Sequence, residues 1–158
     1  MTQISSRRGL HRIVYVSRFS GQFPTAPAEQ DEEIRRIVST SIRNNREHAI
    51  TGLLLSHQQW FIQALEGPAE AVMTTYSRIL SDPRHLAAKI IGAGAAPTRE
   101  FANWNMCARR ISAVDDAILA TLDLKGAIDP AALRLEAAMK LLTAVRGVQS
   151  RTIAAVEA

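Results

Sequence analysis

The sequence has few of the residues that crosslink a protein covalently or through metal ions. Cys107 is the only cysteine among 158 residues, so an internal disulfide and a cysteine-ligated metal cluster are excluded. The histidines, His11, His48, His57 and His85, show no metal-binding spacing. A single cysteine favours a reducing, cytoplasmic setting. The chain is long enough to fold on a hydrophobic core without either kind of crosslink.

Long apolar runs, aromatic residues and nucleotide-binding loops are also scarce. No run approaches the roughly 20 apolar residues of a membrane-spanning helix, and the polar segment Met1–Arg8 predicts neither a signal peptide nor a membrane anchor. Aromatic residues make up 5% of the chain, and the formal net charge is +4. Because the basic residues are scattered and no basic stripe interleaves with aromatics, we expect no nucleic-acid binding. Phosphate-binding loops and serine-nucleophile motifs are absent from the sequence, which argues against an enzyme.

The sequence does contain a regular order of strand and helix patterns. Short apolar or β-branched runs predict five strands, at 13–17, 50–56, 60–65, 86–92 and 103–111. Helical spacing of apolar residues predicts one helix from Glu29 to about Asn44 and a second from Pro68 to Asp82-Pro83. Glu66-Gly67-Pro68 is expected to end the third strand. The order β-α-β-β-α-β-β predicts an α+β fold, a ferredoxin-like sheet with two helices on one face.

The last part of the chain has a helical pattern. Asp129 is expected to cap a long helix that Pro130 opens and Gly147 closes. We therefore divide the chain into a domain of residues 9–112 and a C-terminal helical extension of residues 113–158. The C-terminal helices are expected either to cover the free face of the sheet or to form a dimer contact.

Several polar residues lie on faces that should be apolar. Ser41 and Asn45 continue the apolar stripe of the first helix, and Gln63 shares a strand face with Phe61 and Leu65. A buried amide without hydrogen-bond partners costs about 1–3 kcal/mol. Taken singly, each residue has an ordinary explanation, since Asn45 could cap the helix C-terminus and Gln63 could be exposed.

Aromatic residues in two strands extend this pattern. Tyr15 and Ser17 share a face of the first strand, and Trp104 and Met106 are expected to share a face of the last one. Each of these residues could instead be an ordinary core residue with no role in binding. If these faces point toward the two helices, amides and hydroxyls converge in an apolar pocket, which is typical of a site for a planar cofactor.

Polar residues next to this expected pocket suit such a cofactor. The pair Asn44-Asn45 could bind a ring that alternates carbonyl and N–H groups, because an amide offers both a donor and an acceptor. Asp82, Arg84 and His85, just beyond the second helix, could face the polar edge and phosphates of the cofactor.

Five parts of the sequence, within about residues 9–112, keep the order and spacing of the motifs of one family. They are Val14–Ser17, Asn44–Asn45 followed by Ile50–Leu54, Phe61–Gly67, Asp82–His85 and Phe101–Met106. The pattern resembles the BLUF family, sensors of blue light using FAD. The resemblance implies a photoreceptor, not an enzyme, whose chromophore is FAD bound non-covalently between the two helices of the sheet.

The resemblance also implies which residues contact the flavin. Asn45 would hold a carbonyl and N–H edge of the ring with Asn44 nearby, and Gln63 would lie between Tyr15 and the flavin. The rest of the pocket would be formed by Ile37, Ser41, Leu65, Asp82, Arg84 and His85.

The mechanism implied by the resemblance is light-driven transfer of an electron and a proton from Tyr15 to the flavin. Gln63 is then left rotated or tautomerised, and the absorption spectrum shifts slightly to the red. Trp104 and Met106 would relay this change to the C-terminal helices.

The output is expected to involve other chains. Residues 113–158 carry no catalytic pattern, so the signal would pass to a separate effector protein. A homodimer or higher oligomer, formed through the C-terminal helices or the sheet, is also expected. The alternatives are a light-insensitive binding module of the same fold and a small hydrolase of acylphosphatase type.

Overall fold

The computed structural model describes residues 9–111, 132–147 and 152–157. It contains a six-stranded sheet made of β1 (Leu10–Phe19), β2 (Thr51–His57), β3 (Trp60–Pro68), β4 (His85–Ala95), β5 (Trp104–Ile111) and β6 (Thr152–Glu157). The strand order is β4-β1-β3-β2-β5-β6. Neighbours run antiparallel except β2 and β5, which are parallel. The first four strands of this order form the ferredoxin-like arrangement that the sequence predicts.

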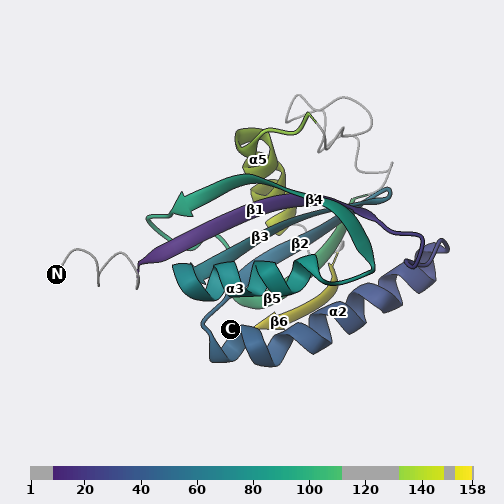
Figure 1. The fold of residues 1–158 in the computed structure, drawn as a ribbon, viewed down its shortest axis with the longest axis horizontal. Coiled ribbons are helices and arrows are strands. Elements are labelled where there is room, and N and C mark those ends of the chain that lie inside the picture. The colour runs from purple at the N-terminus through teal and green to yellow at the C-terminus, as the bar shows by residue number, and fades with distance from the viewer. Residues whose placement is uncertain (1–8, 112–131, 148–151, 158) are drawn as a thin grey trace.

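Helices cover both faces of the sheet (Figure 1). Helices α2 (Pro27–Glu47) and α3 (Ala69–Leu80) lie on one face, where α2 packs over β5 and β6 and α3 packs over β1 and β3. Helix α5 (Leu135–Arg146) lies on the other face. Within the described ranges, no helix is long and apolar enough to cross a membrane.

The central strands supply core residues to both faces. In β1, Ile13 and Tyr15 join the hydrophobic cluster beneath α2 and α3. Val14 and Val16 join the cluster beneath α5. Because successive strand residues point to opposite faces, a strand covered on both sides is apolar throughout. This alternation directs Tyr15 toward the two-helix side.

The third strand is longer than the sequence pattern predicts. The expected break at Glu66–Pro68 is wrong, since Gly67 pairs with His11 and Pro68 with Leu10 of β1. Pro68 is both the last residue of β3 and the residue that precedes α3. A proline is tolerated at a strand end, where its missing N–H interrupts no further ladder. The strand therefore leads into the helix without a loop.

The C-terminal part contains a strand as well as a helix. Helix α5 covers the free sheet face, as one of the two alternatives predicted, and Gly147 is its C-terminal cap. The sequence pattern predicted that the C-terminal extension contains helices only. This prediction is wrong for residues 152–157, which form strand β6 and pair antiparallel with β5. Thr152 and Ile153 are β-branched residues that favour a strand. Asp129 and Pro130 lie outside the described residues, but α5 begins at Leu135 after the N-cap Arg134, so the expected start of this helix at Pro130 is wrong. The boundary at 112 stays a prediction.

The last strand of the predicted domain carries a β-bulge. Trp104 pairs with Glu157, but Met106 pairs with the adjacent Val156, so Asn105 is an extra residue in β5. One extra residue reverses the alternation of side chains. Trp104 therefore packs on the α5 side, whereas Met106 packs on the α2 and α3 side. The expectation that Trp104 and Met106 share a face is wrong for this reason.

Candidate functional site

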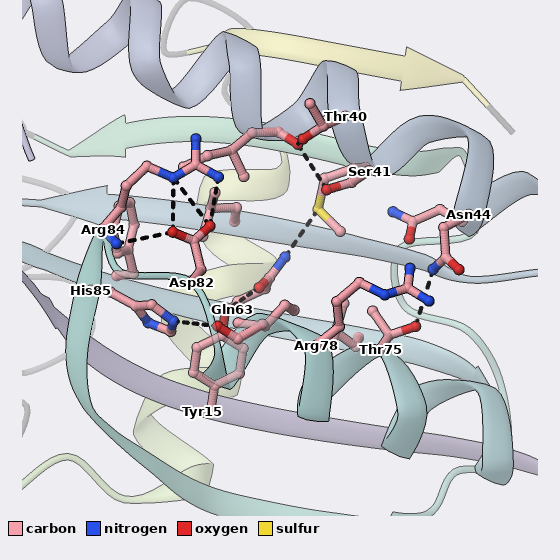
Figure 2. A pocket seen from close by; sticks show the side chains of 17 residues that line it. Tyr15, Thr40, Ser41, Asn44, Gln63, Thr75, Arg78, Asp82, Arg84 and His85 are labelled. Atoms are coloured by element: carbon pink, nitrogen blue, oxygen red, sulfur yellow. Dashed lines mark hydrogen bonds and ion pairs between the residues drawn. The ribbon is translucent and has the colours of Figure 1, made fainter.

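A cavity of about 280 Å³ lies between α2, α3 and the sheet (Figure 2). All the residues that the sequence analysis assigned to a cofactor line it: Tyr15, Ile37, Ser41, Asn44, Asn45, Gln63, Leu65, Asp82, Arg84 and His85. Of the two residues expected to relay the signal, Met106 lines the cavity and Trp104 does not.

Sequence reasoning missed several lining residues. The cavity is also lined by Thr40, Leu54, Phe61, Thr75, Arg78 and Ile79. Thr75, Arg78 and Ile79 precede Asp82 by seven, four and three positions, so they share one side of the helix that the sequence pattern extends to Asp82. Extending the helical spacing backward from Asp82 would have found them.

Tyr15 and Gln63 form a hydrogen-bonded pair at the base of the cavity. They are directly paired residues of the adjacent strands β1 and β3. The Tyr15 hydroxyl donates to Gln63 Oε1, and Gln63 Nε2 donates to Met106 Sδ at 3.4 Å. Tyr15 is 3% exposed and Gln63 is 6% exposed. The amide is thus held at both ends inside the protein, by a phenol and by a thioether.

The surroundings of Tyr15 keep its hydroxyl protonated. Burial raises the pKa of Tyr15 far above its ordinary value, and the nearby Tyr76 and Asp82 raise it further. The Tyr15 ring lies 5.2 Å from the Tyr76 ring and 6.4 Å from the His85 ring, measured between centroids. A neutral phenol in contact with a proton acceptor can release an electron and a proton together.

Asn45 has a buried acceptor atom. It is 1% exposed, and its Nδ2 donates to the carbonyl oxygen of Asn105 at 2.8 Å. Its Oδ1 is buried without a hydrogen-bond partner in the described part of the chain. Helix α2 ends at Glu47 with His48 as its C-cap, so capping does not explain Asn45. An N–H group of a planar ligand would satisfy Oδ1.

Two further polar residues stand on the α2 wall of the cavity. Asn44 Nδ2 donates to Thr75 Oγ1 of α3 at 3.3 Å, which links the two helices. Ser41 Oγ donates to the Ile37 carbonyl of its own helix at 2.7 Å. Ile37, Leu65 and Ile79 add apolar surface between these polar groups.

Charged residues gather at the end of α3. The Arg84 guanidinium donates to Asp82 Oδ1 at 2.9 Å and to Glu33 Oε1 at 2.8 Å. These hydrogen bonds hold the pKa of Asp82 and of Glu33 below their ordinary values. His85 Nε2 donates to the Ile79 carbonyl at 2.7 Å. Arg84 is therefore paired with two carboxylates, of which Glu33 also pairs with Arg36.

The residues present fit a flavin. A flavin ring is flat and apolar on its faces, with carbonyl oxygens, ring nitrogens and an N–H group along its edges. The cavity provides apolar walls, the unpartnered acceptor of Asn45 and the amide of Gln63. This is the usual make-up of a cofactor site, in which few polar groups fix the orientation of a mostly apolar ligand.

Comparison of the sequence with known proteins points in the same direction. A family model described as "BLUF: Sensors of blue-light using FAD" matches residues 10–107. The blue light- and temperature-regulated antirepressor BluF of Escherichia coli is 35% identical over 97 residues, which make up 60% of this chain and 24% of that protein. The photoactivated adenylate cyclase subunit beta of Euglena gracilis is 45% identical over 53 residues, or 34% of this chain and 6% of that protein. The chain thus spans about a quarter or less of the length of these curated relatives.

Solved structures share the fold. The dark state of BlrB, a BLUF protein, superposes with a TM-score of 0.68 at 25% identity, covering 89% of this chain and 97% of that one. A bacterial light-regulated adenylyl cyclase gives a TM-score of 0.61 at 34% identity, covering 72% of this chain and 33% of that one. The photo-activated state of BlsA gives a TM-score of 0.76 at 19% identity, covering 89% and 96%, and supports the fold alone.

Proposed function

The chain belongs to the BLUF family of flavin-binding blue-light sensors, and on this premise we propose that Tyr15 and Gln63 are its photoactive pair. The observation that carries the proposal is the buried chain of hydrogen bonds from Tyr15 through Gln63 to Met106. A phenol that donates to an amide oxygen has an acceptor for its proton. The same amide has a donor end that can find a new partner.

The cofactor in this proposal is FAD, bound non-covalently. Asn45 would hold an N–H of the ring through its unpartnered Oδ1, and Asn44 lies beside it on α2. The remaining contacts come from Ile37, Ser41, Leu65, Asp82, Arg84 and His85, which line the same cavity. FAD bound there would supply the absorption of blue light and the acceptor for an electron and a proton.

Tyr15 and Gln63 carry out the response to that excitation. Tyr15 gives up one electron and one proton, and the proton leaves along the hydrogen bond to Gln63 Oε1. Electron and proton then return to Tyr15, while the Gln63 side chain stays rotated or tautomerised. A thioether sulfur is a weak acceptor, so releasing Gln63 Nε2 from Met106 costs little. The Nε2 group of Gln63, once released, would be free to donate a hydrogen bond to a bound flavin, which would shift its absorption to the red.

The signal leaves the site through β5 and the C-terminal elements. Met106 contacts Gln63 on one face of β5, and Trp104 packs on the other face against the core that includes α5. Arg35 of α2 donates to the carbonyl of Ile153 in β6 at 3.3 Å. The receiver is a separate effector protein, or a homodimer or higher oligomer built through the C-terminal elements or the sheet. The chain itself is a sensor and not an enzyme.

Absorption spectroscopy tests the proposal. Protein purified in the dark is expected to be yellow, to release FAD on denaturation and to shift reversibly to the red under blue light. Gln63→Leu is expected to retain the flavin and lose the normal shift, because leucine can neither accept from Tyr15 nor donate. Gln59→Leu, in the exposed turn between β2 and β3, is the matched control and should behave as wild type.

The outcomes separate the alternatives. If the protein binds flavin but its absorption spectrum does not change under blue light, it is a light-insensitive binding module. A colourless protein that takes up no flavin contradicts the proposal altogether. A normal red shift in Gln63→Leu contradicts the role of Gln63 and leaves flavin binding intact.

A further inference from the structure

A second cavity, of about 530 Å³, lies between the C-terminal end of α2 and the N-terminal end of α3. Asn44 and Thr75 line both this cavity and the first one. The hydrogen bond from Asn44 Nδ2 to Thr75 Oγ1, at 3.3 Å, joins the two helices where the cavities meet (Figure 2). The other residues that line the second cavity have no role in the functional proposal. The second cavity is therefore a neighbour of the flavin site without an assigned ligand.

The first cavity is too small to hold a whole FAD molecule. Sites that enclose a drug-sized ligand have volumes of roughly 300–1,000 Å³, and the first cavity has about 280 Å³. FAD is a long molecule, in which a ribityl chain and two phosphates join the flavin ring to adenosine. The buried side chains of Tyr15, Asn45 and Gln63 suit the ring, so the adenosine end must lie outside the first cavity.

The lining of the second cavity suits a purine nucleoside. Ala49, Pro68 and Ala71 provide small apolar surfaces against which a flat ring can pack. His48 Nδ1 donates to the Asn44 carbonyl at 2.9 Å, so Nε2 of the neutral imidazole is left as an acceptor. The amino group of adenine has N–H donors for such an acceptor.

The charges of the second cavity favour the adenosine end over the phosphates. Glu47 and Glu70 both line the cavity. Arg43 pairs with Glu47 but is not part of the lining, and Glu70 forms no ion pair with any described residue. Carboxylates accept hydrogen bonds from ribose hydroxyls and amino groups, and they repel phosphate groups. The cavity therefore suits an uncharged nucleoside.

We propose that the second cavity binds the adenosine end of FAD and makes the protein prefer FAD to FMN. The inference rests on flavin binding as proposed above, and it adds a site outside the ring pocket. Because the adenosine is covalently joined to a ring held in the first cavity, even weak contacts raise the overall affinity. FMN has the same ring and ribityl phosphate but lacks the AMP part of FAD.

The test is a pair of dissociation constants, for FAD and for FMN, measured by isothermal titration calorimetry with flavin-free protein. Wild type is expected to bind FAD about tenfold more tightly than FMN. Thr74 is an exposed residue of α3 that lines the second cavity and not the first. Thr74→Trp should therefore fill the second cavity with an indole, which reduces the affinity for FAD to that for FMN and leaves FMN within about twofold of wild type.

Ser77→Trp is the matched control. Ser77 is another exposed residue of α3, and it lies outside the lining of both cavities. This variant adds the same indole to the same helix and should bind both flavins as wild type does. If Ser77→Trp also loses the preference for FAD, the effect does not depend on the second cavity, and the adenosine site is contradicted.

The other contrary results separate the two proposals. If wild type binds neither flavin, flavin binding itself is contradicted. If wild type binds FAD and FMN equally, the adenosine site is wrong and the proposed flavin binding stands. A preference for FAD that persists in Thr74→Trp also overturns the adenosine site. An equal loss of both ligands in that variant overturns it as well, because such a loss indicates damage to the ring pocket.

Discussion

Two buried amides, Gln63 and Asn45, have different partners in the pocket. Gln63 uses both ends of its amide inside the protein, but one partner is the thioether of Met106, a weak acceptor. Asn45 uses its donor end on Asn105 and keeps an unpartnered oxygen. Gln63 can therefore exchange one hydrogen-bond partner for another, whereas Asn45 can hold a ligand in one orientation.

The unpartnered oxygen of Asn45 leads to a prediction about flavin affinity. Asn45→Ala is expected to weaken flavin binding by about tenfold, because a hydrogen bond to the ring is lost in a buried site. Fluorescence quenching of added flavin measures the change. Asn103→Ala, at an exposed position before β5, serves as control. Unchanged affinity in Asn45→Ala would show that the ring does not bind at Oδ1.

Among the elements, β5 shows where spacing alone misleads. Helical spacing placed Ser41 and Asn45 on the stripe of α2. Strand alternation assigned Tyr15 and Gln63 to faces of their own strands, and their convergence depended on both faces pointing toward the helices. The structure brings all four residues to one cavity. Alternation failed for Trp104 because the bulge at Asn105 shifts the register. The bulge is held by long-range bonds, from Asn105 Nδ2 to the Ile50 carbonyl at 3.1 Å and from Asn45 Nδ2 to the Asn105 carbonyl. These two bonds join residues 55 and 60 positions apart, so no local sequence pattern predicts them.

The end of β3 is tied to the segment that leads into β5. The Glu66 carboxylate is fully buried, and it accepts from Arg12 Nε at 2.9 Å and from the backbone N–H groups of Glu100 and Phe101 at 2.8 and 2.9 Å. Arg146 of α5 donates to the Glu100 carbonyl at 2.6 Å. Glu66 thus joins β3 to the connection between β4 and β5, which in turn contacts α5.

Removing this carboxylate is expected to destabilise the protein. Glu66→Ala leaves the buried N–H of Phe101, the partly buried N–H of Glu100 and a partly buried guanidinium without their acceptor, at a cost of about 3 kcal/mol in the free energy of unfolding. Urea denaturation followed by circular dichroism measures it. Glu70→Ala, at an exposed site in the first turn of α3, should cost less than about 0.5 kcal/mol. Equal stabilities for the two variants would contradict the role given to Glu66.

At the scale of the whole molecule, the C-terminal elements are part of the sheet's core. Leu141 and Leu142 of α5 are fully buried in the cluster that also contains Leu53 and Leu55 of β2. Strand β6 extends the sheet beside β5, and α2 packs over it. The sequence indicated the helix through its apolar stripe. It did not indicate the strand, because six residues with alanines in the middle carry little pattern of their own.

The ion pairs at the pocket edge give a prediction for acid stability. Asp82 and Glu33 have pKa values lowered from 3.8 and 4.5 in the native protein, chiefly by hydrogen bonds from Arg84. The native state therefore binds fewer protons than the unfolded state just below these pH values, and stability falls as the pH drops. The advantage of wild type over Asp82→Asn in thermal unfolding should be present at pH 6 and shrink toward pH 3. A pH-independent difference would contradict the assignment.

The measurement that tests the central claim most directly is the light-minus-dark absorption spectrum of Tyr15→Phe and Tyr76→Phe. The two phenol rings are 5.2 Å apart, but only the Tyr15 hydroxyl donates to Gln63 among the hydrogen bonds of the described residues. We expect Tyr76→Phe to show the reversible red shift of wild type. Tyr15→Phe should retain flavin and show no such shift. A normal red shift in Tyr15→Phe would contradict the account.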